Sequence, residues 1–428
     1  MMTRLSLQRW HSLRPQDLGR RSGTILGDLV VFLIPALQFF EIDIVGRLFA
    51  PDLAMLALLP FALRSHARQL SAPLPTTLLR LGLLWLFGQV ITDVLRATAF
   101  EDYARGWAKI GLFLISFAVL YTLLSNNPRR VLLYGAGICV GGILGFYLNP
   151  GVYSAGEPWK FGVGGPITLL LVLCATNRLM ARALFLQVLL IASAALINLD
   201  MGFRALAGVC LLTAVYLAFF ARRRRHHEIG LRPALSLIVI CLAAGFAFIK
   251  VYEQGAEAGL FGERVRQKYE SQAGGQLGLL IGGRGEILVS ARAIQDSPIL
   301  GHGSWAKDPE LAWLWLDILR SFGYEAGSSE AAWEGLIPTH SHLFGAWVEA
   351  GILGAVFWVW VLFLAFRALL VLPQAKCPLA GLIAFLAFML MWDVLFSPFG
   401  AERRFITAYY LTALVAVLEE SRLMGSRA

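Results

Sequence analysis

The feature that most constrains this chain is a succession of apolar runs, each close to the length that crosses a lipid bilayer. A membrane-spanning helix needs roughly 20 predominantly apolar residues. Runs approaching this length recur from residue 24 to residue 418. Hydrophobic residues make up 57% of the 428 residues and charged residues only 15%, which is too apolar for an ordinary soluble domain. We therefore expect a polytopic membrane protein.

The hydropathy pattern predicts about twelve transmembrane helices. This number leaves no room for a separate soluble domain, so residues 1–428 are predicted to form a single transmembrane domain of the all-α class. The predicted spans are 24–40, 49–63, 76–95, 107–124, 131–148, 162–175, 184–199, 205–220, 234–249, 343–366, 378–395 and 405–418.

Basic residues fall in every second connection between these spans, which predicts the orientation of the chain. Lys and Arg gather in the cytoplasmic connections of membrane proteins, so the tail 1–23 and the C-terminus are both predicted to be cytoplasmic. The basic residues on this side are Arg64, Arg68, Arg129, Arg130, Arg178, Arg182, the run 222–225, Arg367, Lys376, Arg422 and Arg427. The net charge of +9 follows from this distribution, and no nucleic-acid partner is expected.

One long segment, 250–339, is predicted to lie on the outer side of the membrane. It is rich in Gly, Glu, Asp and Trp, and a connection of this length is typical of a functional loop. The chain has no P-loop and no dinucleotide-binding glycine pattern, and its five cysteines form neither a metal-ligand pair nor a disulfide framework. We expect no cofactor, and a substrate that arrives already activated on a lipid or a partner.

Arg204 lies at the predicted outer mouth of a span, against the orientation rule. One interpretation is an arginine that extends its guanidinium to the interface and pairs with Asp200 or Glu41. The other is a site for an anion.

Three further arginines lie on the outer side. Arg284 stands among glycines just before a helix predicted to begin at Glu286, and its guanidinium can bind phosphate oxygens in a bidentate manner. A solvated loop arginine is the alternative. Arg403 and Arg404 form an outward basic pair, with Glu402 as a local partner.

Only three of the seven histidines, His302, His340 and His342, are predicted to face outward. His340 stands where the loop becomes a span, and the positive end of a helix dipole disfavours a protonated imidazole. This position suits a general base. Two alternatives are an unreactive interfacial histidine and a metal site of all three. Helical residues separated by one do not share a face, so no metal is predicted.

The stretch that begins at His340 and continues to Glu349, Gly351 and Gly354 resembles the signature of the bacterial O-antigen ligase and O-antigen polymerase superfamily. In that family a histidine enters a helix that carries a Glu-x-Gly-x-x-Gly pattern. Ser341 stands where many members have Asn.

Two upstream stretches extend the resemblance. Arg284 and the turn 298–303 are similar to the family's arginine segment and its Pro-x-x-Gly-x-Gly turn. Arg204 is similar to the arginine that enters the span before a basic cytoplasmic loop, with Gly202 and Phe203 in place of small polar residues.

The resemblance implies a GT-C type membrane glycosyltransferase of the bacterial inner membrane, with its active site facing the periplasm. Its donor would be an undecaprenyl diphosphate-linked glycan, and its acceptor either lipid A-core, as in a ligase, or another lipid-linked glycan, as in an O-antigen or exopolysaccharide polymerase. His340 would be the general base, while Arg204 and Arg284 would bind the diphosphate without a metal ion. Further substrate contacts are predicted at His302, His342, Glu349, Arg403 and Arg404.

A multi-span transporter or a flippase for lipid-linked glycans is the alternative from another class. Carriers often have about twelve spans with both ends inside, but they carry ionisable residues near span centres and broken helices in corresponding halves. Here the candidate charges gather at the outer mouth, and the long loop has no counterpart in the first half of the chain.

Overall fold

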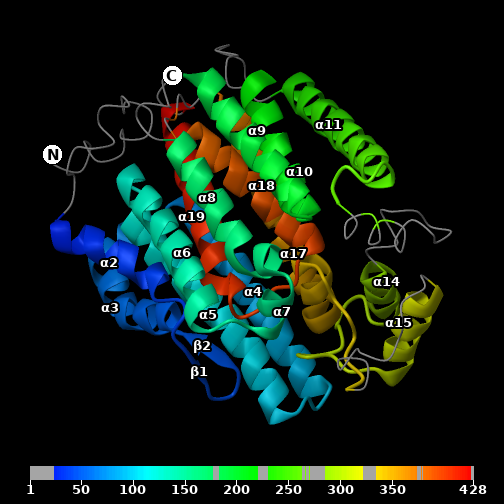
Figure 1. The fold of residues 1–428 in the computed structure, drawn as a ribbon. Coiled ribbons are helices and arrows are strands. Elements are labelled where there is room, and N and C mark those ends of the chain that lie inside the picture. The colour runs from blue at the N-terminus through cyan, green and yellow to red at the C-terminus, as the bar shows by residue number, and fades with distance from the viewer. Residues whose placement is uncertain are drawn as a thin grey trace.

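A computed structural model describes residues 24–176, 183–219, 230–262, 285–321, 334–373 and 379–425, together with Arg266, Tyr269 and Cys377. Helices dominate these residues (Figure 1). Several residues used above lie outside them, namely the tail 1–23, Arg178, Arg182, the run 222–225, Arg284, Lys376 and Arg427.

Each segment predicted to span the membrane contains a helix. In chain order the elements are α2 (Ile25–Ala36), β1 (Glu41–Asp43), β2 (Arg47–Phe49), α3 (Ala50–Leu70), α4 (Pro73–Leu95), α5 (Phe100–Leu124), α6 (Pro128–Leu148), α7 (Val152–Gly156), η2 (Trp159–Val163), α8 (Gly164–Ala175), α9 (Leu184–Asp200), α10 (Arg204–Phe219), α11 (Leu231–Glu257), α14 (Glu286–Asp296), α15 (Pro309–Ser321), α17 (His342–Val371), α18 (Ala380–Phe396) and α19 (Arg403–Gly425). The predicted loop 250–339 thus includes the end of α11 as well as α14 and α15.

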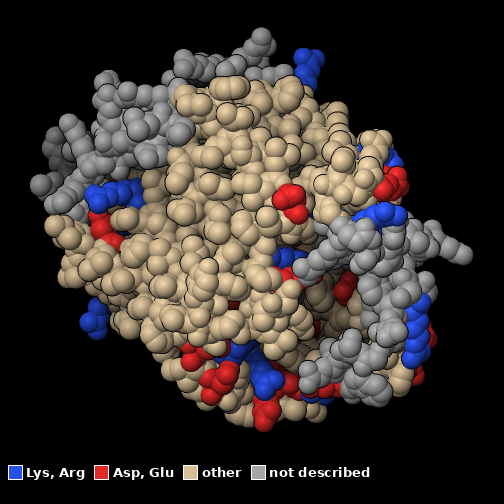
Figure 2. Space-filling model, viewed as in Figure 1, with Lys and Arg blue, Asp and Glu red and all other residues tan. Residues whose placement is uncertain are grey.

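The lengths and compositions of these helices identify a helical membrane protein. Among the described residues five helices are long and apolar enough to cross a membrane, namely α4, α5, α6, α11 and α17. Shorter apolar helices are α2, η2 with α8, α9, α10 and α18. Figure 2 shows a broad face whose middle is almost free of Lys, Arg, Asp and Glu, as contact with hydrocarbon requires.

A two-stranded hairpin between α2 and α3 departs from the purely helical chain that we predicted. β1 and β2 pair antiparallel, with Glu41 opposite Phe49 and Asp43 opposite Arg47. Gly46 has a φ of 116°, which a residue with a Cβ rarely adopts. The strands are only three residues long, so they fall below what the apolar pattern can resolve.

The centre of the bundle is aromatic. Trp85 of α4 stacks on Phe357 of α17 with ring centroids 5.2 Å apart, and Phe113 of α5 packs edge-on to Phe357 at 5.9 Å. Phe399, just before α19, closes the cluster against Phe113 at 5.3 Å. In contrast α11 lies at the edge of the bundle, packs mainly on α10 and leaves most of its length exposed (Figure 1).

Helix α17 is broken at Gly351, where φ is 63° and ψ is −153°. The segment 297–304 lies in this break and replaces the lost helical hydrogen bonds. The N–H of Ile352 donates to Ile299 O at 3.2 Å, and the N–H of His302 donates to Val348 O at 2.7 Å. A Cβ on Gly351 would overlap Ile299 O. The Pro-x-x-Gly-x-Gly turn and the Glu-x-Gly-x-x-Gly pattern are therefore packing partners of each other.

The end of α4 holds the same segment from its other side. The Arg96 guanidinium donates to Gly301 O at 2.9 Å and to Ser297 Oγ at 2.8 Å. Asp93 accepts from the Ser304 N–H at 2.6 Å and from the Trp107 indole N–H at 2.8 Å. The segment is thus fixed between α4 and α17, and it anchors α14, which precedes it in the chain.

Candidate active site

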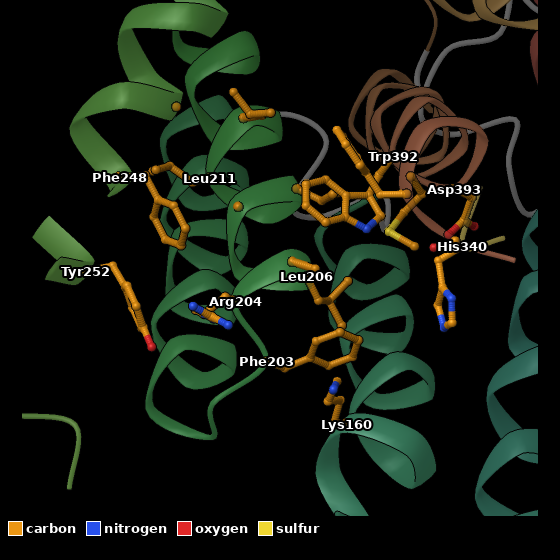
Figure 3. Close-up of a pocket in the computed structure, with 18 of the residues that line it drawn as sticks. Lys160, Phe203, Arg204, Leu206, Leu211, Phe248, Tyr252, His340, Trp392 and Asp393 are labelled. Atoms are coloured by element: carbon orange, nitrogen blue, oxygen red, sulfur yellow. The ribbon is translucent and has the colours of Figure 1, made fainter. Parts of the chain in front are cut away.

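A cavity of about 620 Å³ lies between α10, α11 and α18, where α10 and α19 begin and α11 and α18 end (Figure 3). Among the described residues, its charged and histidine lining consists of Lys160, Arg204, Glu286, His340, Asp393 and Arg403. Its apolar wall includes Leu206, Leu211, Leu212, Phe248 and Met389. The cavity therefore combines several cationic groups with a hydrocarbon-like wall.

Arg204 is the first residue of α10 and lines this cavity. The turn before it needs Gly202, which has a φ of 74°, and the Phe203 N–H donates to Asn198 O at 2.7 Å. This left-handed position explains why a glycine stands in the motif. The Arg204 guanidinium lies 4.9 Å from the centre of the Tyr252 ring of α11.

Glu41, one of the two partners considered for Arg204, is engaged elsewhere. It lies 4.0 Å from Arg47 and accepts a hydrogen bond from Asn149. Arg204 lines the cavity and lies beside the aromatic ring of Tyr252.

His340 also lines the cavity, on the side opposite Arg204 (Figure 3). It lies two residues before α17, its side chain is 55% exposed, and Nδ1 is 3.7 Å from Glu286 Oε1. The next residue, Ser341, caps α17 by accepting from the Phe344 N–H at 3.0 Å. Ser and Asn are both good helix caps, so Ser341 can begin the helix as well as the Asn of the resembled pattern.

Arg403 enters the cavity from the start of α19. Its guanidinium donates to Asp393 Oδ2 of α18 at 2.8 Å, and the Asp393 side chain is almost fully buried. The predicted partner Glu402 instead lies 3.4 Å from Arg47. Asp393 thus orients Arg403 within the lining.

Two other predicted contact residues lie outside the lining of this cavity. Arg404 is buried, pairs with Asp52 and donates to Arg47 O at 2.8 Å. Glu349 accepts from Lys109 Nζ at 2.6 Å. Arg404 and Glu349 therefore hold elements of the bundle together through ion pairs.

The two other histidines that were predicted to face outward are also held within the fold. His342 is fully buried against Trp358, and its Nδ1 lies 2.6 Å from Ser397 O. His302 Nε2 lies 2.8 Å from Ala293 O. Within the described ranges no three His, Cys, Asp or Glu side chains gather as a metal site requires.

Arg284 lies outside the described residues, but Glu286, two residues further on, lines the cavity. Sequence reasoning missed Lys160, Glu286 and Asp393 as lining residues. Only Asp393 carried a signal, because an acidic residue inside an apolar run marks a partner or a site.

The fold and the cavity together define a helical membrane protein with an amphipathic site at one end of its bundle, to which the described residues contribute cationic and acidic side chains. Comparisons of the chain with protein families, with curated proteins and with solved structures find no match. The chemistry of the cavity is therefore the basis for assigning a function.

Proposed function

We propose that this protein is a glycosyltransferase of the O-antigen ligase and O-antigen polymerase superfamily, which moves a glycan from undecaprenyl diphosphate to an acceptor hydroxyl. The observation that carries the proposal is the amphipathic cavity. A polyprenyl diphosphate needs cationic groups for its phosphates and an apolar wall for its chain. Lys160, Arg204 and Arg403 supply the charge, and α10 and α11 supply the wall.

In the proposed reaction the acceptor hydroxyl attacks the anomeric carbon of the donor sugar. The new carbon–oxygen bond forms as the bond from that carbon to the diphosphate breaks. Arg204 and Arg403, with Arg284, which stands two residues before Glu286 in the sequence, stabilise the negative charge that develops on the diphosphate. His340 takes the hydroxyl proton, and undecaprenyl diphosphate leaves.

The proposed topology has twelve spans, with both termini in the cytoplasm and the cavity on the periplasmic face of a bacterial inner membrane. Basic residues support it, because Arg64 and Arg68 of α3 and Arg129 and Arg130 of α6 lie at helix ends away from the cavity. A ligase and a polymerase would share this donor site and differ in the acceptor, which is lipid A-core or a second lipid-linked glycan.

The proposal is tested with purified protein in lipid nanodiscs, an undecaprenyl diphosphate-linked glycan and both acceptors. The wild type is expected to release undecaprenyl diphosphate and to form glycosylated acceptor. Arg204→Gln is expected to lower kcat/KM for the donor by about 10- to 100-fold, because a hydrogen bond to a charged group contributes about 1.5–3 kcal/mol.

The matched control for Arg204→Gln is Arg320→Gln, which removes the same charge from an exposed position in α15. It is expected to leave the reaction unchanged. A wild type that never consumes donor overturns the proposed function, and movement of intact donor across liposomes would then identify a transporter.

A second prediction concerns the apolar wall. Gly245 of α11 lines the cavity, and a Cβ there meets no atom within 4 Å. Gly245→Leu is therefore expected to fold, to project into the wall, and to raise the donor KM by about tenfold or more for long prenyl chains. Short-chain donors should be less affected.

Gly111→Leu in α5 is the control for this substitution, because its Cβ also meets no atom within 4 Å and it lies outside the cavity lining. Equal effects of the two leucines on long-chain donors would contradict a prenyl-binding wall between α10 and α11.

A further inference from the structure

Glu286 is the acidic group that faces His340 in the cavity. It is the first residue of α14, its side chain is 17% exposed, and its Oε1 lies 3.7 Å from His340 Nδ1. Both residues line the same cavity. This separation is longer than a hydrogen bond, and catalytic contacts commonly shorten when substrate binds.

The backbone around the two residues is held in place. Ser290, one turn after Glu286, places its hydroxyl 2.8 Å from Glu286 O and 3.0 Å from Pro338 O, and so brings α14 together with the segment before His340. On the other side, Ser341 donates its hydroxyl to Val394 O of α18 at 2.8 Å. The backbone at His340 is thus fixed between α14 and α18, and its side chain lies beside Glu286.

The other charges of the cavity make this carboxylate distinctive. Arg204 and Lys160 face the cavity from α10 and η2, and Arg403 faces it from α19. In the part of the chain that the structure describes, Asp393 is the other acidic lining residue, and it pairs with Arg403 at 2.8 Å. Glu286 is therefore the carboxylate placed to act on His340.

We propose that Glu286 is the positioning residue of His340, an inference that rests on the proposed function. Its carboxylate accepts the Nδ1–H of the imidazole, because the partner of one ring nitrogen decides which nitrogen carries the proton. Nε2 is then unprotonated and takes the proton of the acceptor hydroxyl as the sugar leaves the diphosphate. The carboxylate stabilises the imidazolium that results.

The test compares Glu286→Gln, Glu286→Asp, His340→Ala and the double variant Glu286→Gln/His340→Ala. Glu286→Gln is expected to lower kcat by about 10- to 100-fold with the donor KM unchanged, as an orienting partner supplies part of the effect of a general base. Glu286→Asp should restore part of the rate. In a protein that already carries His340→Ala, Glu286→Gln is expected to lower kcat no further, because both substitutions act through one imidazole.

Glu310→Gln is the matched control, since Glu310 lies in the first turn of α15 and outside the cavity lining. It removes the same charge from a helix start and is expected to leave kcat unchanged. The positioning role would be overturned if the kcat losses of the two single variants multiplied in the double variant, or if Glu286→Gln kept the full kcat. The glycosyltransferase assignment would stay in place.

A second readout needs no glycan transfer. Modification of His340 by diethyl pyrocarbonate, followed by mass spectrometry, reports the reactivity of its free ring nitrogen. The reaction is expected to slow in Glu286→Gln and to match the wild type in Glu310→Gln. An unchanged rate in Glu286→Gln overturns the pairing, whatever reaction the wild type catalyses.

Discussion

Replacing Gly351 with alanine is expected to destabilise the folded protein by about 3–5 kcal/mol and to prevent its accumulation in the membrane. The backbone at Gly351, with φ 63° and ψ −153°, is in a region open essentially to glycine alone. A Cβ there would also overlap Ile299 O, which is backbone and cannot turn away. The segment 297–304 would lose its place in the break of α17, and α14 would lose its support.

Thermal unfolding of detergent-purified protein measures this effect, together with the yield of monodisperse protein. Gly111→Ala is the control, because Gly111 lies inside α5 and its Cβ would meet no atom within 4 Å. Alanine is favoured over glycine in a helix by about 1 kcal/mol, so this variant should melt at the wild-type temperature or above it. A Gly351→Ala protein as stable as the wild type would contradict the packing of the two glycine motifs.

Replacing His340 with alanine is expected to lower kcat by about 10²- to 10⁴-fold, which is the usual contribution of a general base. Donor binding should persist, because Arg204, Lys160 and Arg403 remain in the lining. The physical reason is that only the transfer step needs a proton acceptor. Single-turnover rates and equilibrium binding of the lipid-linked donor separate the two effects.

His302→Gln is the matched control for His340→Ala. His302 lies outside the cavity lining and places Nε2 2.8 Å from Ala293 O, a contact that a glutamine amide can reproduce. Full transfer in His340→Ala would remove the base assignment. Equal losses in both variants would mean that the histidines matter for folding rather than for proton transfer.

The helical architecture of this protein follows from local patterns in the sequence. A segment that spans a bilayer has few alternatives to a helix. A run of apolar residues therefore predicts both where an element lies in the chain and that this element is a helix. Helix starts also follow local rules. Asn127 stands just before Pro128, the first residue of α6, and its side chain accepts a hydrogen bond from the Arg130 N–H. The short β1–β2 hairpin escaped prediction because its strands are only three residues long and carry no apolar period.

The candidate site was predictable only in part. Arg204 and His340 were identified as site candidates from their predicted outer position, and they line one cavity. Lys160 and Glu286 gave no sequence signal, because a lysine or a glutamate near a helix start is ordinary at a membrane surface. The two glycine motifs were noted in the sequence only as parts of a family resemblance, and only the tertiary structure shows that they pack against each other.

Two pairs of residues that are close in sequence, Arg403 with Arg404 and His340 with His342, show what the sequence by itself determined and what only the tertiary structure decided. The sequence determined that Arg403, Arg404, His340 and His342 lie at one end of the helices, because hydropathy fixes where spans stop. Only the tertiary structure decided their environments. Arg403 and His340 line the cavity, while Arg404 pairs with buried Asp52 and His342 packs on aromatic rings. Residues so close in sequence diverge because side chains leave the backbone in different directions and meet partners contributed by distant parts of the chain.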